Sequence, residues 1–281
     1  MAYDKLSCLR VSVQDGIAHV TLDHPPINLL DEVMSQELDQ LTQELELDTS
    51  VRVVILQSAI PEFFMAHSGL ARVTAGPRSP KEVSTTPAFR LTQVIGERLR
   101  NMPKVTIAKV EGRARGGGNE IVIAADMTFA ARETALFGQP EVMVGLVPGG
   151  GSTQRLPPLI GRGRALEVLL GGEDFSASMA EQYGWINRAL DAQELGPFVD
   201  ALAHRIASFP SHTVAHIKAA VNLGSQALIP SNLLVEAQQA NVCVASDVTR
   251  ARVSEGLSLG METFEGELNL PAFAGKLSPL R

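Results

Sequence analysis

Hydrophobic and polar residues alternate over two short stretches near the N-terminus. Leu9–Val13 and Ile17–Leu22 show this alternation on either side of an Asp-Gly pair, which favours a tight turn. The pattern predicts a β-hairpin. Asp31 then precedes apolar residues at helical spacing that continue to Leu45, which predicts a helix with Asp31 as its N-cap.

The next part of the chain alternates between strands and helices. Val51–Leu56 and Val105–Val110 are apolar, β-branched runs, as expected of buried parallel strands, and a helix is predicted between them over Phe89–Leu99. Further predicted elements are a helix over Asn119–Ala125, strands over Met127–Ala131 and Ala135–Phe137, and helices over Arg164–Leu170 and Ser178–Tyr183. This alternation predicts an α/β fold with crossover connections.

The pattern changes at about residue 195, beyond which every periodic segment has helical spacing. The predicted helices cover Leu202–Ala207, Val214–Val221, Leu233–Ala245 and Val248–Met261. We therefore expect an α/β core over residues 1–195 and a helical C-terminal region over 196–281. Residues 71–89 contain three prolines and scattered charges, which predicts a mobile surface loop.

Composition narrows the possible partners. A net charge of −7 argues against nucleic acid or an anionic membrane as the main partner. The two cysteines form no C-x-x-C pair, which fits a reducing compartment. The chain shows neither a signal peptide nor an apolar run of the roughly 20 residues that span a bilayer. These features predict a cytoplasmic protein with no membrane partner.

A first candidate for chemistry is the segment Gly116–Glu120, between a buried strand and an apolar helix. Glycines allow close backbone approach, and the first amides of a helix lack internal partners and can stabilise an oxyanion. Glu120 would lie beside them in the first turn. The glycines alone are more often explained by a tight strand-to-helix turn. Neither phosphate-binding pattern, G-x-x-x-x-G-K-[ST] or G-x-G-x-x-G, is present at this segment.

The second candidate is Phe137–Glu141. Pro140 cannot donate to a central strand ladder, so the segment should be irregular and could hold Glu141 at a cleft. Two carboxyl groups at one site would supply a general acid and a general base. Taken alone, Glu141 resembles an ordinary surface glutamate, and sequence spacing does not show whether it meets Glu120.

Together these segments resemble the crotonase (enoyl-CoA hydratase/isomerase) superfamily over roughly residues 8–264. Gly112–Glu120 matches its G-x-x-x-G-G-G-x-E signature, Phe137–Glu141 its F-G-x-P-E segment, and Pro148–Gln154 its P-G-x-G-x-T-Q stretch. Phe64–Gly69 is similar to its F-x-A-G-A-D loop. The resemblance implies a spiral core of repeated ββα units, and assembly as homotrimers or dimers of trimers.

The resemblance also implies a site. It assigns the backbone amides of Ser68 and Gly117 to an oxyanion hole for an acyl-CoA thioester, and Glu120 and Glu141 to an acid–base pair that adds water across the C2=C3 bond of a trans-2-enoyl-CoA. Other substrate-binding positions are Ala66, Gly69, Leu70 and Arg72. No metal and no separate cofactor are implied, because coenzyme A is part of the substrate. The alternatives are an enoyl-CoA isomerase, an acyl-CoA hydrolase, or a non-catalytic protein that binds CoA thioesters or a protein partner.

The chain departs from the family pattern in three places. His67 stands where glycine is common, and we expect it to be structural; Gly69 stands where aspartate is common. Near the C-terminus, Glu265–Asn269 replaces a basic run that lies near the CoA phosphates in many relatives. Phosphate contacts would then come from Arg72 or Lys276, each equally well explained as a solvated charge.

Overall fold

The computed structural model describes residues 3, 5–75, 88–225 and 229–277. Its larger sheet has six strands in the order β1-β2-β3-β5-β7-β10, antiparallel between β1 and β2 and parallel elsewhere. The strands are β1 Leu9–Gln14, β2 Ile17–Leu22, β3 Val53–Ser58, β5 Val105–Val110, β7 Met127–Ala131 and β10 Arg188–Leu190. The predicted hairpin and the two buried parallel strands are confirmed.

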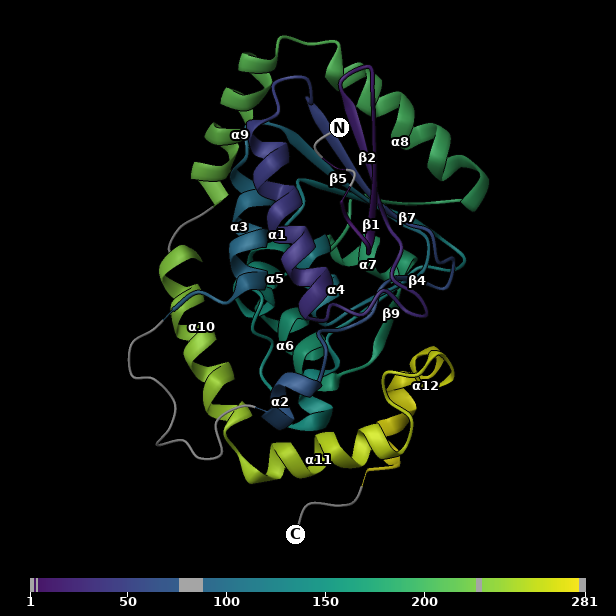
Figure 1. Cartoon of the computed structure of the whole chain (residues 1–281), viewed down its shortest axis with the longest axis vertical. Helices are drawn as coiled ribbons and strands as arrows, with labels where there is room; N and C mark the ends of the chain where they lie inside the picture. The colour runs from purple at the N-terminus through teal and green to yellow at the C-terminus, as the bar shows by residue number, and fades with distance from the viewer. Residues whose placement is uncertain (1–2, 4, 76–87, 226–228, 278–281) are drawn as a thin grey trace.

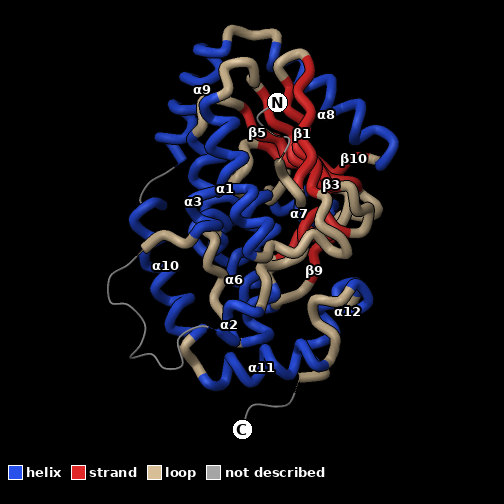
Figure 2. The backbone as a smooth tube through the Cα atoms, in the orientation of Figure 1, coloured by secondary structure: helices blue, strands red, loops and turns tan. Residues whose placement is uncertain are grey.

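A second sheet of three-residue strands lies beside the first (Figure 2). Its strands are β4 Phe63–Met65, β6 Arg113–Arg115, β8 Leu136–Gly138 and β9 Asp174–Ser176, in the order β4-β6-β8-β9. The sequence analysis missed β4, β6, β9 and β10, because three residues are too few to establish a period of two.

Helices connect and cover these strands. They are α1 Glu32–Leu47, α2 Ala71–Ala75, α3 Leu91–Asn101, α4 Gly117–Val122, α5 Ser152–Ile160, α6 Arg162–Gly171, α7 Ala177–Tyr183, α8 Ala192–Ala207, α9 Ser211–Ser225, α10 Ile229–Val244, α11 Asp247–Ser258 and α12 Phe264–Leu268, with 3-10 segments η2 Pro140–Val144 and η3 Leu270–Gly275. Asp31 caps α1 as predicted, since its Oδ1 accepts from the Met34 amide at 2.9 Å.

Side chains on opposite faces of the larger sheet enter two separate cores. Val54 and Leu56 of β3 pack in the core that includes α1 and α3, whereas Val53 and Ile55 pack against α8. Figure 1 shows α8 on one side of the sheet and α1 with α3 on the other. Both faces of the parallel strands are buried, which explains why their sequences are unbroken apolar runs instead of alternating patterns.

The C-terminal helices α9 to α12 follow without a strand between them in the described residues. Helix α9 packs on α3, α10 on α5, and α11 on α2 and η2. In Figure 1, α11 and α12 extend across the end of the molecule opposite the hairpin. None of the described helices combines the length and apolar composition needed to cross a membrane.

Three predicted boundaries differ clearly from the structure. The helix predicted over Leu202–Ala207 begins at Ala192, ten residues earlier, as part of α8. The segment expected as a loop over residues 71–89 begins with the helix α2, because Leu70 and Val73 are buried against the side chains of η2 and α11. The predicted mobility of residues 76–87 lies outside the described residues. The helix predicted over Asn119–Ala125 begins earlier, at Gly117, so that the glycines form its first turn.

Candidate active site

A cavity of about 270 Å³ lies between the α/β core and the C-terminal helices. One part of its wall is apolar and is formed by Leu70, Val73, Val144, Leu146, Val147, Val244 and Met261. Another part carries Ser68, Glu120 and Glu141. The fold therefore brings the two predicted carboxyl groups to one enclosed space.

Glu120 is held by the N-terminus of α5. Its Oε1 accepts hydrogen bonds from the amides of Gly150 (2.7 Å) and Ser152 (3.1 Å). The other oxygen, Oε2, lies 2.2 Å from the position that a Cβ on Gly150 would occupy. Only glycine at position 150 therefore leaves room for this carboxyl orientation.

Glu141 lies in the irregular segment that Pro140 was expected to impose, here the 3-10 turn η2. Its Oε1 is 3.1 Å from the position that a Cβ on Gly116 would take, so the turn before α4 packs directly against the carboxyl group. Its Oε2 is buried and accepts no hydrogen bond within the described part of the chain. The hydrogen-bonding capacity of this oxygen is therefore unused in the described part of the chain.

Burial changes the protonation of both carboxyl groups. It raises the pKa of Glu120 to about 8, and the negative charges of Glu141 and Glu236 add to the effect. It also raises the pKa of Glu141 to about 7, against the opposing charge of His67. Because the two groups interact, near neutral pH the pair holds about one proton. One group can then accept a proton while the other donates one.

The backbone of Gly117 lies against Ser68, and Ser68 lines the cavity with Glu120 and Glu141. Gly117 is the first residue of α4, where an amide has no partner within the helix. A Cβ on Gly117 would lie 2.3 Å from the Ser68 Oγ and 3.3 Å from the Ser68 nitrogen. These short distances show that the two backbones are in direct contact.

The direction of the Ser68 amide follows from a β-bridge between Leu30 and Ser68. Leu30 donates to the His67 carbonyl and Gly69 donates to the Leu30 carbonyl, both at 3.1 Å. In such a parallel bridge the N–H of the central residue points to the opposite side. Among the described residues, neither the Ser68 amide nor the Gly117 amide donates to a protein group.

The other predicted substrate-binding residues have different positions. Gly69 and Leu70 line the cavity with Ser68. Ala66 is buried against Ile27 and Phe63 and is not part of the lining. The side chain of Arg72 lies outside the described residues.

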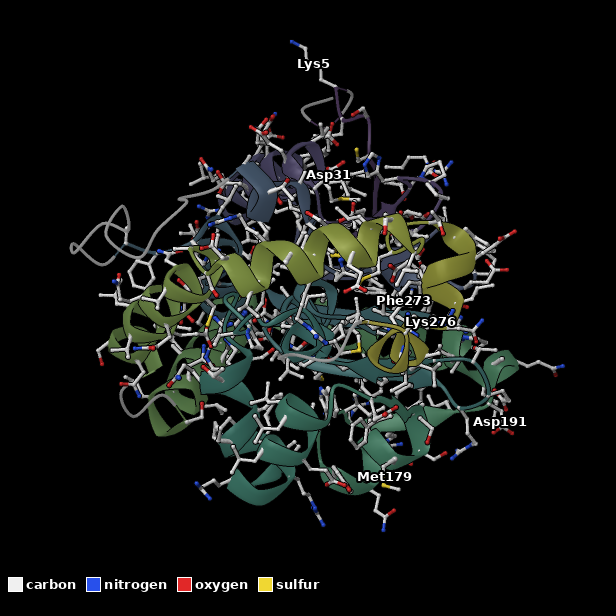
Figure 3. The ribbon with its side chains drawn as sticks, turned by 90° about the horizontal axis from the view of Figure 1, so that it is seen from below. Lys5, Asp31, Met179, Asp191, Phe273 and Lys276 are labelled. Carbon is white, nitrogen blue, oxygen red and sulfur yellow. The ribbon has the colours of Figure 1, made fainter. Side chains whose placement is uncertain are left out.

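Of the predicted phosphate-binding residues, Lys276 can be placed. Its Nζ lies 4.9 Å from the centre of the Phe273 ring, and Figure 3 shows the two side chains next to each other. It does not line the cavity. Its proposed contact with phosphate therefore stays a prediction.

The sequence analysis missed a third carboxyl group, that of Glu236 in α10. It is buried, its Oε2 accepts from the amide of Thr153 at 3.0 Å, and its Oε1 accepts from the side chain of Gln93 at 3.1 Å. Glu120 and Glu236 thus bind different amides at the start of α5: Glu120 binds those of Gly150 and Ser152, and Glu236 binds that of Thr153. Nothing in the local sequence separates Glu236 from a surface glutamate, because only the packing of α10 on α5 buries it.

Comparison with known proteins identifies the family. Residues 12–265 match the family described as Enoyl-CoA hydratase/isomerase. The short-chain-enoyl-CoA hydratase of Clostridium acetobutylicum is 32% identical over 82% of this chain and 87% of its own. The crotonyl-CoA hydratase of Syntrophomonas wolfei is 30% identical over 88% of this chain and 92% of its own.

The fold agrees with that assignment. The crystal structure of a candidate enoyl-CoA hydratase from Streptomyces avermitilis superimposes with a TM-score of 0.85 and 40% identity, covering 96% of this chain and 98% of the other. The chain belongs to the enoyl-CoA hydratase/isomerase family and has the crotonase fold.

The close approach of Gly150 to Glu120 gives a test of this site. Gly150→Ala would place a methyl group 2.2 Å from the Glu120 Oε2 and should move that carboxyl group. We expect turnover of an enoyl-CoA thioester to fall about 100-fold, since small misplacements of a catalytic group have effects of this size. Gly163→Ala is the matched control, because a Cβ at position 163 meets nothing within 4 Å. Equal turnover by the two variants would contradict the placement of Glu120.

Proposed function

We propose that this protein is an enoyl-CoA hydratase that adds water across the C2=C3 double bond of a trans-2-enoyl-CoA. The observation that carries the proposal is a pair of buried carboxyl groups whose raised pKa values leave them about one proton near pH 7, beside two unpaired amides. Hydration requires these groups together, since one proton must leave a water and another must reach carbon.

The amides supply the electrostatic part of the reaction. When the thioester oxygen lies against the Ser68 and Gly117 amides, both N–H groups stabilise the negative charge that develops on it. The positive end of the α4 dipole lies at Gly117 and adds to this stabilisation. The β-carbon thereby becomes electrophilic.

The carboxyl pair supplies the proton transfers. The ionised carboxylate takes a proton from a water bound between the two groups, and the hydroxide formed bonds to C3. The electrons of the double bond move towards the thioester, and the protonated carboxyl group delivers its proton to C2. The next water, in contact with both groups, returns the proton from the first carboxyl to the second. Either glutamate can take either part in this cycle.

The names of the relatives support hydration, since two that align with this chain over most of their length are named short-chain-enoyl-CoA hydratase and crotonyl-CoA hydratase. An isomerase also moves protons at an enolate, but one acid–base group is enough for that. A protein that only binds CoA thioesters has no use for two buried carboxyl groups, whose burial costs free energy.

The proposal is tested by incubating the protein with trans-2-enoyl-CoA thioesters of several chain lengths and measuring product mass. We expect a gain of one water for at least one substrate. Glu120→Gln and Glu141→Gln should each lower kcat about 100-fold with a smaller change in KM, because an amide fills the same space but exchanges no proton. An unchanged mass would favour isomerisation, and release of free CoA would favour hydrolysis. Full turnover by either variant would remove that glutamate from the mechanism.

The pKa values also predict the pH dependence of the reaction. Activity needs one carboxyl group ionised and the other protonated. We therefore expect kcat/KM to fall below about pH 7, where both groups become protonated, and above about pH 8, where both become ionised. A rate that stays constant from pH 5 to pH 10 would contradict this assignment.

We also propose that the protein forms homotrimers through its C-terminal helices. Large apolar side chains are exposed on this region, namely Ile217, Val221 and Leu223 of α9, Val235 and Val242 of α10, and Val248 of α11. Sedimentation equilibrium should give three or six times the chain mass of 30.0 kDa. Ile217→Glu combined with Val221→Glu should shift the mass towards one chain. A monomeric wild-type protein would contradict the proposal.

The cytoplasm is the compartment that we propose. Cys8 and Cys243 are both free thiols, as expected where disulfides are kept reduced.

A further inference from the structure

The loop that carries Ser68 is bound by two glutamates of the C-terminal region, Glu262 just before α12 and Glu267 within α12. The Leu70 amide donates to the Glu262 Oε1 at 2.6 Å. The His67 Nε2 lies 3.1 Å from the Glu267 Oε1. Ser68, whose amide points away from Leu30, lies between these two attachment points.

The contacts of His67 define its charge. Its Nδ1 lies 3.0 Å from the Ser68 carbonyl, and its Nε2 faces the Glu267 carboxylate. A carbonyl and a carboxylate only accept hydrogen bonds, so both ring nitrogens must carry hydrogen. His67 is therefore an imidazolium, paired with a carboxylate that is itself fully buried.

The position of Glu267 is fixed in turn by the core. Arg115 of β6, with 1% of its surface exposed, donates to the Glu267 carbonyl and forms two bonds with the Asp174 carboxylate, at 2.7 and 2.5 Å. The Glu267 Oε1 also accepts from the Glu262 amide at 2.8 Å. Glu267 thus binds the second sheet through its backbone carbonyl, and the Ser68 loop and the Glu262 amide through its carboxylate.

Backbone strain is found at the same place. Glu262 has a φ of 68°, in the left-handed region that glutamate rarely adopts. Such a conformation persists only where the surrounding contacts impose it. Here it directs the Glu262 carboxylate to the Leu70 amide.

We propose that His67, Glu262 and Glu267 are positioning residues that hold the Ser68 amide in place for the thioester oxygen. The inference rests on the proposed function, because the Ser68 amide has a catalytic role only in a reaction that develops an oxyanion. Glu262 and Glu267 contact the loop and do not line the cavity, whereas His67 belongs to the loop and lines the cavity beside Ser68. The C-terminal region thereby completes the oxyanion hole of its own chain.

The charges around His67 agree with this role. Burial alone would disfavour the cation, but the charge and hydrogen bond of Glu267 raise the pKa of His67 to about 9. The groups facing the ring are Glu262 and Glu267 from the C-terminal segment and Glu141 from η2, while Arg115 reaches it through Glu267. His67 therefore stays charged over the pH range in which the carboxyl pair holds one proton.

The first test removes one attachment point. Glu262→Ala should lower kcat about tenfold with KM changed less than twofold, because a displaced donor weakens binding of the oxyanion more than binding of the substrate. Glu262→Gln keeps an oxygen that can accept from Leu70 and should recover most of that loss. Glu265→Gln is the matched control, since Glu265 is exposed in the same segment. A lower melting temperature with unchanged kcat for Glu262→Ala would overturn the proposal.

The second test removes the charge that faces His67. In Glu267→Gln the pKa of His67 should fall, so the ring loses a proton at a lower pH than in the wild type. In the wild type the alkaline fall follows loss of the last proton of the carboxyl pair above about pH 8, so a His67 whose pKa lies below about 8 in Glu267→Gln should move the fall in kcat to lower pH. A pH profile identical to that of the wild type would show that His67 does not position the loop.

Failure of the proposed function would be recognised separately. If the wild-type protein hydrates no enoyl-CoA, the proposed function is wrong, and hydrogen exchange decides the positioning role. Peptides covering residues 66–70 should then exchange faster in Glu262→Ala than in Glu265→Gln. Equal exchange rates in the two variants would overturn the positioning role regardless of activity.

Discussion

The site depends on the burial of two carboxyl groups in one cavity. Burial of a carboxylate is unfavourable unless hydrogen bonds or opposite charges compensate for lost hydration. Glu120 receives two amide hydrogen bonds from the start of α5, whereas the Oε2 of Glu141 has no partner among the described residues. The pair responds by retaining a proton near neutral pH. That retained proton is what makes acid–base chemistry possible there.

Close backbone packing is what allows the groups to meet. A Cβ on Gly117 would collide with Ser68, one on Gly118 would lie 2.3 Å from the Met65 carbonyl, and one on Gly150 would collide with Glu120. Because each glycine lacks a Cβ, segments that are distant in the sequence can pack in direct contact at these positions. The first turn of α4 can then lie directly on the Ser68 loop.

The C-terminal region contributes directly to the site. Glu236 of α10 binds the start of α5, which also holds Glu120. Glu262 and Glu267 bind the Ser68 loop from the other side. The acidic Glu265–Asn269 stretch, which departs from the family pattern in sequence, therefore includes one residue with a buried structural partner, Glu267. Both halves of the site are supported by helices that follow the α/β core in the chain.

Local patterns in the sequence were sufficient for elements with a clear period. The hairpin, the buried strands β3 and β5 and the helices α1 and α3 follow from the alternation or helical spacing of their own residues, whereas only the last six residues of α8 were predicted and α5 was missed. The glycine-rich turn and Pro140 likewise marked the two segments that carry Glu120 and Glu141, and the family resemblance connected them. The boundary between core and C-terminal region at residue 195 stays a prediction.

Only the tertiary structure determines which side chains are buried and which groups contact one another. The short strands and α2 form because neighbouring segments pair with them or bury them, which no local period records. Glu236 and Glu265 are both glutamates in helices of the same region, yet the first is buried against α5 and the second is exposed. The same holds for the charge of His67 and the raised pKa values of the carboxyl pair, because burial and the distance between charges arise only when distant segments pack together.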